Sequence, residues 1–156
     1  RNLGKDWRFK SEIYYQHLYN IPVQSTPSSY AIINEGADFV FDERGSLVNE
    51  GTGRNYGLEL TLEKFFSNDY YLLMTTSLFD SKYSGSDGIE RSTSFNNQFV
   101  YNVLFGKEWK FGPAQRNAWT FDTKFTTSGG KPYTPVDLEA TRANAGREVR
   151  MDEIAY

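Results

Sequence analysis

Apolar and polar side chains alternate along residues 54–81, and the alternation is cleanest in the first half of this stretch. On an extended chain one side carries only apolar residues, namely Tyr56, Leu58, Leu60 and Leu62. The other side carries Asn55, Gly57, Glu59, Thr61 and Glu63. A period of two residues predicts a β-strand whose two faces meet different media. Ser67-Asn68-Asp69 predicts a tight turn, because these side chains bond nearby backbone groups, and a second antiparallel strand follows.

The same alternation recurs in further segments, so the chain is predicted to be all-β, an antiparallel up-and-down meander of about five long strands. The predicted strands cover residues 6–20, 54–66, 70–81, 95–110 and 117–127. Residues 6–20 do not suit a helix, because their apolar positions fall mostly at every second residue and aromatic residues are weak helix formers. Short strands are also expected at 30–33 and 38–41, and a short helix within 138–150.

The connections between the predicted strands alternate in length. Residues 67–69 and 111–116 form short connections, whereas 21–53, 82–94 and the segment after 128 are long and polar. Alternate connections of a meander lie at opposite ends of the sheet, so we expect tight turns at one end and long polar loops at the other. The predicted strands also exceed the usual length of about five or six residues. Together with the aromatic faces, these features are typical of a transmembrane β-barrel of the outer membrane.

Aromatic residues mark the ends of the predicted strands. Tyrosine and tryptophan suit a membrane interface, because the ring contacts lipid while the polar tip reaches water. The strand ends beside the short connections, where a periplasmic girdle is expected, carry Trp7, Phe9, Phe65, Phe66, Tyr70, Tyr71, Trp109 and Trp119.

The composition narrows the class of protein further. Of the 156 residues, 38% are apolar and 17% are aromatic, which suits strand-rich chains and argues against disorder. The net charge is −3 and the basic residues are scattered, so no nucleic-acid partner is expected. The absence of cysteine excludes disulfides and thiol catalysis. No apolar run has the length of a transmembrane helix. No signal peptide is recognisable and the chain opens (RNLGKDW) in a predicted turn before a strand, so we expect it to be a piece of a longer protein.

Four segments resemble the C-terminal barrel of TonB-dependent outer-membrane receptors, especially the Bacteroidetes type. Residues 49–64, with Gly57-Leu58-Glu59-Leu60 at their centre, are similar to a recurrent receptor strand after a long loop. Residues 70–83 and 102–108 resemble the strands that follow, and residues 129–135 (GGKPYTP) resemble the start of a loop in that family. The likeness covers nearly the whole chain, although a plug domain, a TonB box and a terminal barrel strand are missing from it.

This resemblance implies that residues 1–156 form part of a receptor β-barrel domain in the cell outer membrane. Receptors of this family are not enzymes; they bind and import scarce nutrients such as iron chelates, cobalamin or glycans. The implied partners are outer-membrane lipid, a small nutrient ligand, and the TonB complex acting through a plug outside this chain. No cofactor is implied. Taken alone, the fragment is expected to self-associate, because unpaired edges recruit strands and apolar patches seek cover.

Catalytic chemistry is not indicated by the carboxylates or by the single histidine. Glu59 and Glu63 share a strand face but lie about 13 Å apart at about 3.3 Å per residue, too far for a glycosidase pair. They are expected to be solvated on the polar face, so no catalytic residue is predicted. His17 has no second histidine or cysteine to join it, so it predicts no metal site.

Loop carboxylates and glycines allow two further kinds of site, and neither fits well. The carboxylates that suit calcium by chemistry match no EF-hand spacing; they are Asp42, Glu43, Asp80, Asp87 and Glu90. The glycines precede no strand–loop–helix unit and no Gly-Lys-Ser/Thr, so they indicate loop flexibility rather than a phosphate site. These glycines are Gly45, Gly51, Gly53, Gly85, Gly88, Gly129 and Gly130.

Loop aromatics are the remaining candidates for contact with a ligand. They are Tyr30, Phe39, Phe41, Tyr83 and Tyr133. Such rings either stack on a ligand or pack the loops together, and the sequence does not decide between the two.

Two other classes of protein compete with the barrel. A soluble β-sandwich that binds carbohydrate or mediates cell-surface adhesion would use aromatic loops or a sheet face to stack on sugars. The strand lengths and the loop asymmetry count against it. A β-rich enzyme such as a glycoside hydrolase domain would need two carboxylates within catalytic reach.

Overall fold

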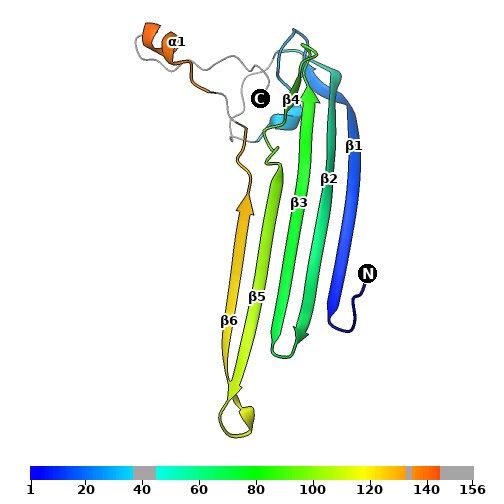
Figure 1. The fold of residues 1–156 in the computed structure, drawn as a ribbon. Helices are drawn as coiled ribbons and strands as arrows, with labels where there is room; N and C mark the ends of the chain where they lie inside the picture. Colours follow the sequence, from blue (N-terminus) through cyan, green and yellow to red (C-terminus); the bar gives the residue numbers. More distant parts are fainter. Residues whose placement is uncertain (37–44, 133–134, 145–156) are drawn as a thin grey trace. The chain divides into compact units, whose positions relative to one another are not determined.

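The structure is a computed structural model and describes residues 1–36, 45–132 and 135–144. Strands dominate it, with two 3-10 helices and one short α-helix (Figure 1). In chain order the elements are β1 (Trp7–Gln24), η1 (Ile32–Asn34), β2 (Leu47–Ser67), β3 (Tyr70–Ser84), β4 (Glu90–Ser92), β5 (Phe99–Phe111), η2 (Pro113–Gln115), β6 (Asn117–Ser128) and α1 (Leu138–Ala143). Within the described ranges, no helix has the length and hydropathy needed to cross a membrane.

The strands form one antiparallel sheet in the order β1-β2-β3-β5-β6, and β4 pairs with β3. Between β3 and β5 the register joins Leu72 to Phe105 and Met74 to Val103. Among the described strands β1 and β6 are the outer ones and do not pair with each other, so the sheet is not closed. The predicted all-β antiparallel meander of five long strands is confirmed.

The chain divides into two compact units. The first, called the sheet unit, comprises Arg1–Tyr14, Tyr56–Phe79 and Gln98–Gly129. The second, called the loop unit, comprises Tyr15–Asn55, Asp80–Asn97 and Gly130–Tyr156. Residues 37–44, 133–134 and 145–156 of these ranges are not described by the structure. Both short connections between long strands belong to the sheet unit, and the long connections belong to the loop unit.

Two short connections join the hairpins of the sheet unit. Asn68 and Asp69 adopt φ values of 53° and 62°, the type I′ arrangement that matches the twist of the flanking strands. The predicted turn at Ser67-Asn68-Asp69 is therefore confirmed. Between β5 and β6 the chain passes through Gly112, at φ 82°, into η2. Glycine suits this positive φ because it has no Cβ.

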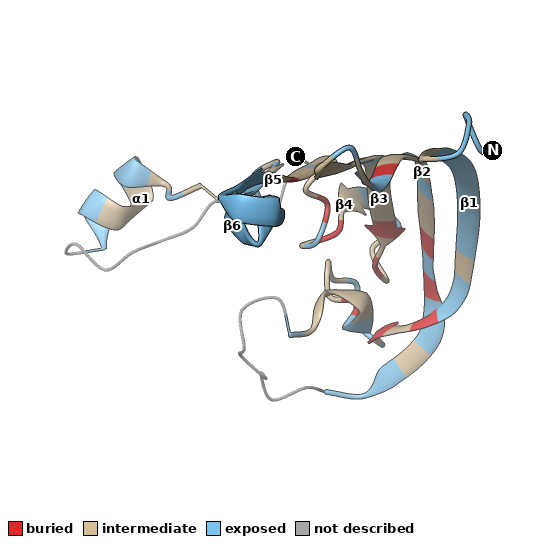
Figure 2. Ribbon diagram, turned by 90° about the horizontal axis from the view of Figure 1, so that it is seen from below, coloured by how far each residue is buried: buried red, intermediate tan, exposed pale blue. Residues whose placement is uncertain are grey.

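The sheet unit contains no buried apolar side chain among its described residues. Many side chains of β3 and β5 are half-buried by their neighbours, whereas β6 is exposed along almost its whole length (Figure 2). Side chains on alternate sides of a single sheet layer have only their same-face neighbours for cover. The unit therefore presents two open faces.

The loop unit has a small hydrophobic core. Val23 and Ala31 are 0% and 1% exposed, and Ile21 and Tyr83 join them at 8% and 5%. Gly51 lies against this core, where a Cβ would approach Val23 Cγ1 to 2.5 Å and the Ile21 carbonyl oxygen to 2.9 Å. Close packing therefore requires glycine here.

In the loop unit, two buried polar residues, Thr93 and Asn96, attach the segment between β3 and β5 to the end of β3 through hydrogen bonds. The Asn96 side chain donates to Asp80 Oδ1 at 2.8 Å and accepts from the Ser81 N–H at 3.1 Å. Thr93 Oγ1 donates to Ser81 Oγ at 2.9 Å. Asn96 and Thr93 are 2% and 1% exposed, and such groups are tolerated inside a protein because they are hydrogen-bonded.

Three strand boundaries differ from the predicted ones by four residues or more. β1 continues to Gln24 past Pro22, because an outer strand tolerates proline. β2 begins at Leu47 rather than at residue 54, and Gly51 and Gly53 are strand residues rather than flexible loop. β5 begins at Phe99 rather than at residue 95, because Gln98 has φ 66° and the chain before it is held by Asn96.

The predictions for the connecting segments have mixed outcomes. The predicted strand at 30–33 is wrong: Ala31 forms an isolated bridge to Val23, and Ile32–Asn34 is η1. Here the Asn34 N–H donates to the Ala31 carbonyl, which turns the chain away from an extended path. The predicted strand at 38–41 lies outside the described residues. A helix within 138–150 is confirmed at Leu138–Ala143, and Asp137 caps it by accepting from two backbone N–H groups.

Candidate functional site

Side-chain contacts show which residues of β1 and β2 share a face. Arg8 forms an ion pair with Glu63 at 2.5 Å. A Cβ on Gly57 would lie 2.7 Å from the Tyr14 hydroxyl, so Tyr14 covers this glycine. Because side chains alternate along a strand, Arg8 and Tyr14 of β1 lie on the same face as Gly57, Glu59 and Glu63 of β2.

The opposite face continues from β2 across β3 and β5. Lys64 Nζ lies 3.7 Å from the centroid of the Tyr70 ring, which puts alternate residues of β2 and β3 on one side. In the registers of β3, β5 and β6, Tyr70 opposes Lys107 and Lys107 opposes Phe121. Directly opposed residues share a face, so the same side extends to β6.

We call this side of the sheet unit the apolar face. Ile13, Trp119 and Phe125 on it are 84%, 72% and 61% exposed. Its only charged residues on the described strands of the unit are Lys64 and Lys107. Its apolar members are Trp7, Phe9, Ile13, Tyr56, Leu58, Leu60, Leu62, Tyr70, Leu72, Met74, Leu78, Phe99, Tyr101, Val103, Phe105, Trp109, Phe111, Trp119, Phe121 and Phe125.

The other side, called the polar face, carries the carboxylates of these strands. Asn102 links β3 to β6, because its Nδ2 donates to Thr75 Oγ1 at 3.2 Å and its Oδ1 accepts from Thr126 Oγ1 at 2.9 Å. The Tyr71 hydroxyl donates to Asp122 Oδ1 at 2.6 Å. These bonds connect β3, β5 and β6 through groups that also suit contact with water.

Gly106, on the polar face, is covered by side chains of the two strands beside β5. A Cβ there would approach Tyr71 Cε1 to 2.1 Å and Asp122 Oδ1 to 2.5 Å. The Tyr71 ring therefore lies over Gly106 and reaches the strand beyond it. The arrangement fixes the register of three strands without an apolar core.

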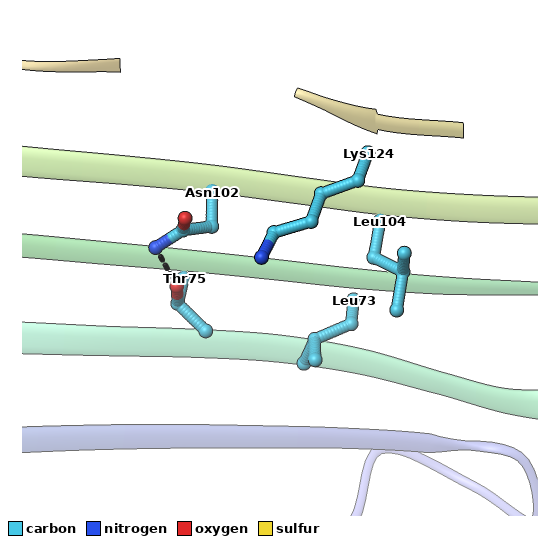
Figure 3. Close-up of a pocket in the computed structure, with 5 residues that line it drawn as sticks. All are labelled: Leu73, Thr75, Asn102, Leu104 and Lys124. Atoms are coloured by element: carbon cyan, nitrogen blue, oxygen red, sulfur yellow. Dashed lines mark hydrogen bonds between the residues drawn. The ribbon is translucent and has the colours of Figure 1, made fainter. Parts of the chain in front are cut away.

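A shallow depression on the polar face is lined by Leu73, Thr75, Asn102, Leu104 and Lys124 (Figure 3). The five side chains come from β3, β5 and β6. Lys124 lies along this depression, which mixes one cation with an amide, a hydroxyl and two leucines. This depression is open to solvent, so it does not enclose a small molecule.

Aromatic residues gather at the strand ends beside the short connections of the sheet unit. Trp109 and Trp119 oppose each other and are 52% and 72% exposed. Phe111 packs edge-on against Trp119 with ring centroids 5.9 Å apart. Trp7 and Phe9 open β1, whose neighbour is the end of β2, because the Phe65 N–H donates to the Asp6 carbonyl. The residues predicted as a girdle therefore lie at matching strand ends.

Of the five predicted ligand contacts, the structure describes two, both in the loop unit. Tyr83 is 5% exposed and packs with Ile21 and Val23, so its ring supports the loops. Tyr30 is half-buried and its hydroxyl donates to Glu35 Oε1 at 3.1 Å. Phe39, Phe41 and Tyr133 lie outside the described residues.

The carboxylates considered for calcium are engaged by cations. Asp87 pairs with Arg91 at 2.7 Å, Glu90 pairs with Arg54 at 2.7 Å, and Asp80 lies 3.8 Å from Lys82. Two hydrogen bonds from the Arg91 guanidinium hold the pKa of Asp87 below its ordinary value. Asp42 and Glu43 lie outside the described residues. In the described part of the chain, no group of three or more histidines, cysteines, aspartates or glutamates is placed to hold a metal ion.

The buried pair Thr93 and Asn96 was not found from the sequence. Thr93 lies in the serine- and glycine-rich segment predicted as a polar loop, and Asn96 lies at the start of the predicted strand 95–110. No local pattern distinguishes them from their exposed neighbours, because their partners Asp80 and Ser81 are brought near by the turn of the chain.

No known protein family, curated protein or solved structure matches this chain. The sequence and the geometry of the two units are therefore the basis for assigning a function.

Proposed function

We propose that the chain is part of the wall of a TonB-dependent receptor barrel in the outer membrane. In this proposal the apolar face contacts lipid and the polar face lines the aqueous lumen. The whole receptor binds a scarce nutrient, of the iron chelate, cobalamin or glycan type, and imports it with energy from TonB. The observation that carries the proposal is the exposed apolar face over five strands of the sheet unit.

Exposed apolar surface of this extent is costly in water. Burial is worth about 25 cal/mol per Å² of apolar area, and soluble monomers rarely expose patches larger than a few hundred Å². A soluble β-sandwich would cover the face with a second sheet. The described residues of the sheet unit contain no second layer, so a lipid environment explains the face more directly.

The polar face supports the same assignment from the other side. It carries Glu59, Glu63, Asp122 and Lys124, and its side-chain hydrogen bonds join β3 both to the adjacent β5 and to β6 beyond it. In barrels of the outer membrane, apolar positions face lipid and polar positions face the interior. The aromatic strand ends match the girdles that flank the lipid-facing band.

Accessibility of single cysteines tests the orientation of the two faces. The chain has no cysteine, so Leu60→Cys and Glu59→Cys, one at a time in the protein that carries this chain, give two matched probes on adjacent residues. In intact outer membranes we expect a polar maleimide to label Glu59→Cys and to spare Leu60→Cys. Equal labelling of both, together with recovery of the protein without detergent, would contradict the proposal.

Uptake measurements test the transport part of the proposal. Cells that lack the protein should lose energy-dependent uptake of one of the three nutrient types, and uptake should return with the intact gene. Removal of TonB should give the same loss. Unchanged uptake of all three types would leave the barrel without the proposed function.

A further inference from the structure

The charges of the sheet unit are distributed very unevenly between its faces. On the described strands of this unit all carboxylates lie on the polar face, whereas the apolar face has only Lys64 and Lys107. Both lysines lie beside the same ring, with Nζ atoms 3.7 Å and 5.8 Å from the Tyr70 centroid. Two like charges thus lie beside one ring on a surface that is otherwise apolar.

Asp69, the carboxylate of the turn, lies near enough to Lys107 for their charges to interact, but it forms no ion pair with either lysine of the apolar face within the described residues. Asp69 forms its ion pair with Lys110, on the polar face, at 2.9 Å. Lys64 is 3% exposed, and its ammonium group donates to Ser67 O, Ser67 Oγ and Tyr70 O. Lys64 therefore supplies positive charge but has no spare donor.

Lys107 is the lysine with donors to spare. The one hydrogen bond that its Nζ makes within the described residues is to the Asn68 carbonyl, at 3.3 Å. Tyr70 and Phe121 oppose it on the two neighbouring strands, and Trp109 follows two residues later on the same face. An anion that approaches Lys107 must therefore lie beside an aromatic and aliphatic surface.

We propose that Lys107, supported by the charge of Lys64, binds the phosphate of an anionic phospholipid headgroup. The inference rests on the proposed function, because it requires the apolar face to contact a bilayer. A phospholipid meets both demands of the surface: its phosphate satisfies the ammonium donors, and its acyl chains cover the neighbouring rings and leucines. A lysine close to an anionic membrane surface contributes about 1 kcal/mol, or about a fivefold change in binding.

Tryptophan fluorescence gives a direct readout of the lipid at this position. The three tryptophans of the chain are Trp7, Trp109 and Trp119, and all lie on the apolar face. The protein that carries this chain, with any tryptophan elsewhere in it replaced by phenylalanine, is reconstituted into bilayers of phosphatidylcholine and phosphatidylglycerol, with either lipid brominated in its acyl chains. We expect brominated phosphatidylglycerol to quench with about fivefold higher apparent affinity than brominated phosphatidylcholine, and the preference to fall in high salt.

Three variants separate the role of Lys107 from a general charge effect. Lys107→Gln should bring the ratio of the two affinities close to one, and Lys107→Arg should retain the preference. Lys124→Gln removes the same charge from the neighbouring strand on the polar face, and it should leave the ratio unchanged. Circular dichroism of each variant checks that the β-structure is retained.

The outcomes distinguish this inference from the proposed function. Quenching by both lipids with equal affinity, or a preference that survives Lys107→Gln, overturns the phospholipid site and leaves the barrel assignment standing. Absence of quenching by either lipid overturns the barrel assignment itself, and the phospholipid site with it.

Discussion

The two units of this chain are stabilised in different ways. The loop unit has a small closed core around Val23, Ala31 and Tyr83, and its polar groups are hydrogen-bonded inside it. The sheet unit has long strands and a regular register but no buried apolar side chain among its described residues. Regular strands therefore do not by themselves make a core here.

The two units therefore need different surroundings. The loop unit buries its own apolar groups, so its stability should depend little on lipid or detergent. The sheet unit leaves its apolar face open, so the free energy of covering that face must come from another apolar medium. Substitutions in the two units should accordingly respond differently to the same change of medium.

The largest effect is expected from Tyr83→Ala in the loop unit. Loss of a buried aromatic side chain costs about 3–5 kcal/mol, since both its transfer free energy and its packing contacts are lost. Amide hydrogen exchange should show lower protection around Thr93 and Asn96, to the same degree in detergent and in bilayers. Tyr83→Phe keeps the ring and should cost less.

If the effect of Tyr83→Ala vanished in bilayers, the two units would not differ in their need for lipid. This result would mean that the loop unit, like the sheet unit, takes its stability from lipid. Equal loss of protection along β5 and β6 would show that the two units unfold as one.

A somewhat smaller effect is expected from Leu60→Arg on the apolar face. Arginine on the lipid side of a barrel strand costs roughly 2–4 kcal/mol at the bilayer midplane. Equilibrium unfolding from bilayers, carried out in the protein that carries this chain, measures that cost. Glu59→Gln, on the adjacent residue of the polar face, should change stability little.

Equal costs for Leu60→Arg and Glu59→Gln would contradict the assignment of the faces. The contrast between the two variants is sharper than either value alone, because both substitutions lie in the middle of β2 and disturb the same backbone.

The sequence was sufficient where a local pattern determines the structure. The alternation from Tyr56 to Leu62 predicted the strand and its faces, and Asn68-Asp69 predicted the turn that the φ values confirm. The sequence was not sufficient where a contact between residues far apart in the chain determines the local structure. Gly51 was read as loop flexibility, yet it is a strand residue whose missing side chain makes room for Val23.

The candidate surfaces show the same limit. The apolar residues of each strand could be identified from their spacing. That Lys64 and Lys107 both lie beside the Tyr70 ring depends on the register of β2, β3 and β5, which the spacing does not give. Tyr30 and Tyr83 were equivalent as loop aromatics. Only the folded loop unit distinguishes the buried Tyr83 from the half-buried Tyr30, because burial follows from segments far apart in sequence.

The smallest effect is expected from acid in the loop unit. Arg91 donates to both carboxylate oxygens of Asp87, at 3.0 Å and 2.7 Å, and the pKa of Asp87 lies below its ordinary value of 3.8. A lowered pKa means that the ion pair stabilises the fold above pH 3.8, and this contribution is lost as the pH falls through the pKa of the folded state. The contribution is expected to be about 1 kcal/mol or less.

Asp87→Asn tests this small contribution without a change in size. At pH 6 the variant should show faster amide exchange than the wild type at Ile89, whose N–H donates to Asp87 Oδ1 at 3.0 Å. In acid the two proteins should converge, because protonation removes the same charge from the wild type. If the difference in exchange at Ile89 persists at low pH, hydrogen bonds that do not depend on the charge of Asp87 stabilise this loop. Residues of the sheet unit, where Asp87 makes no contact in the described structure, serve as the internal reference.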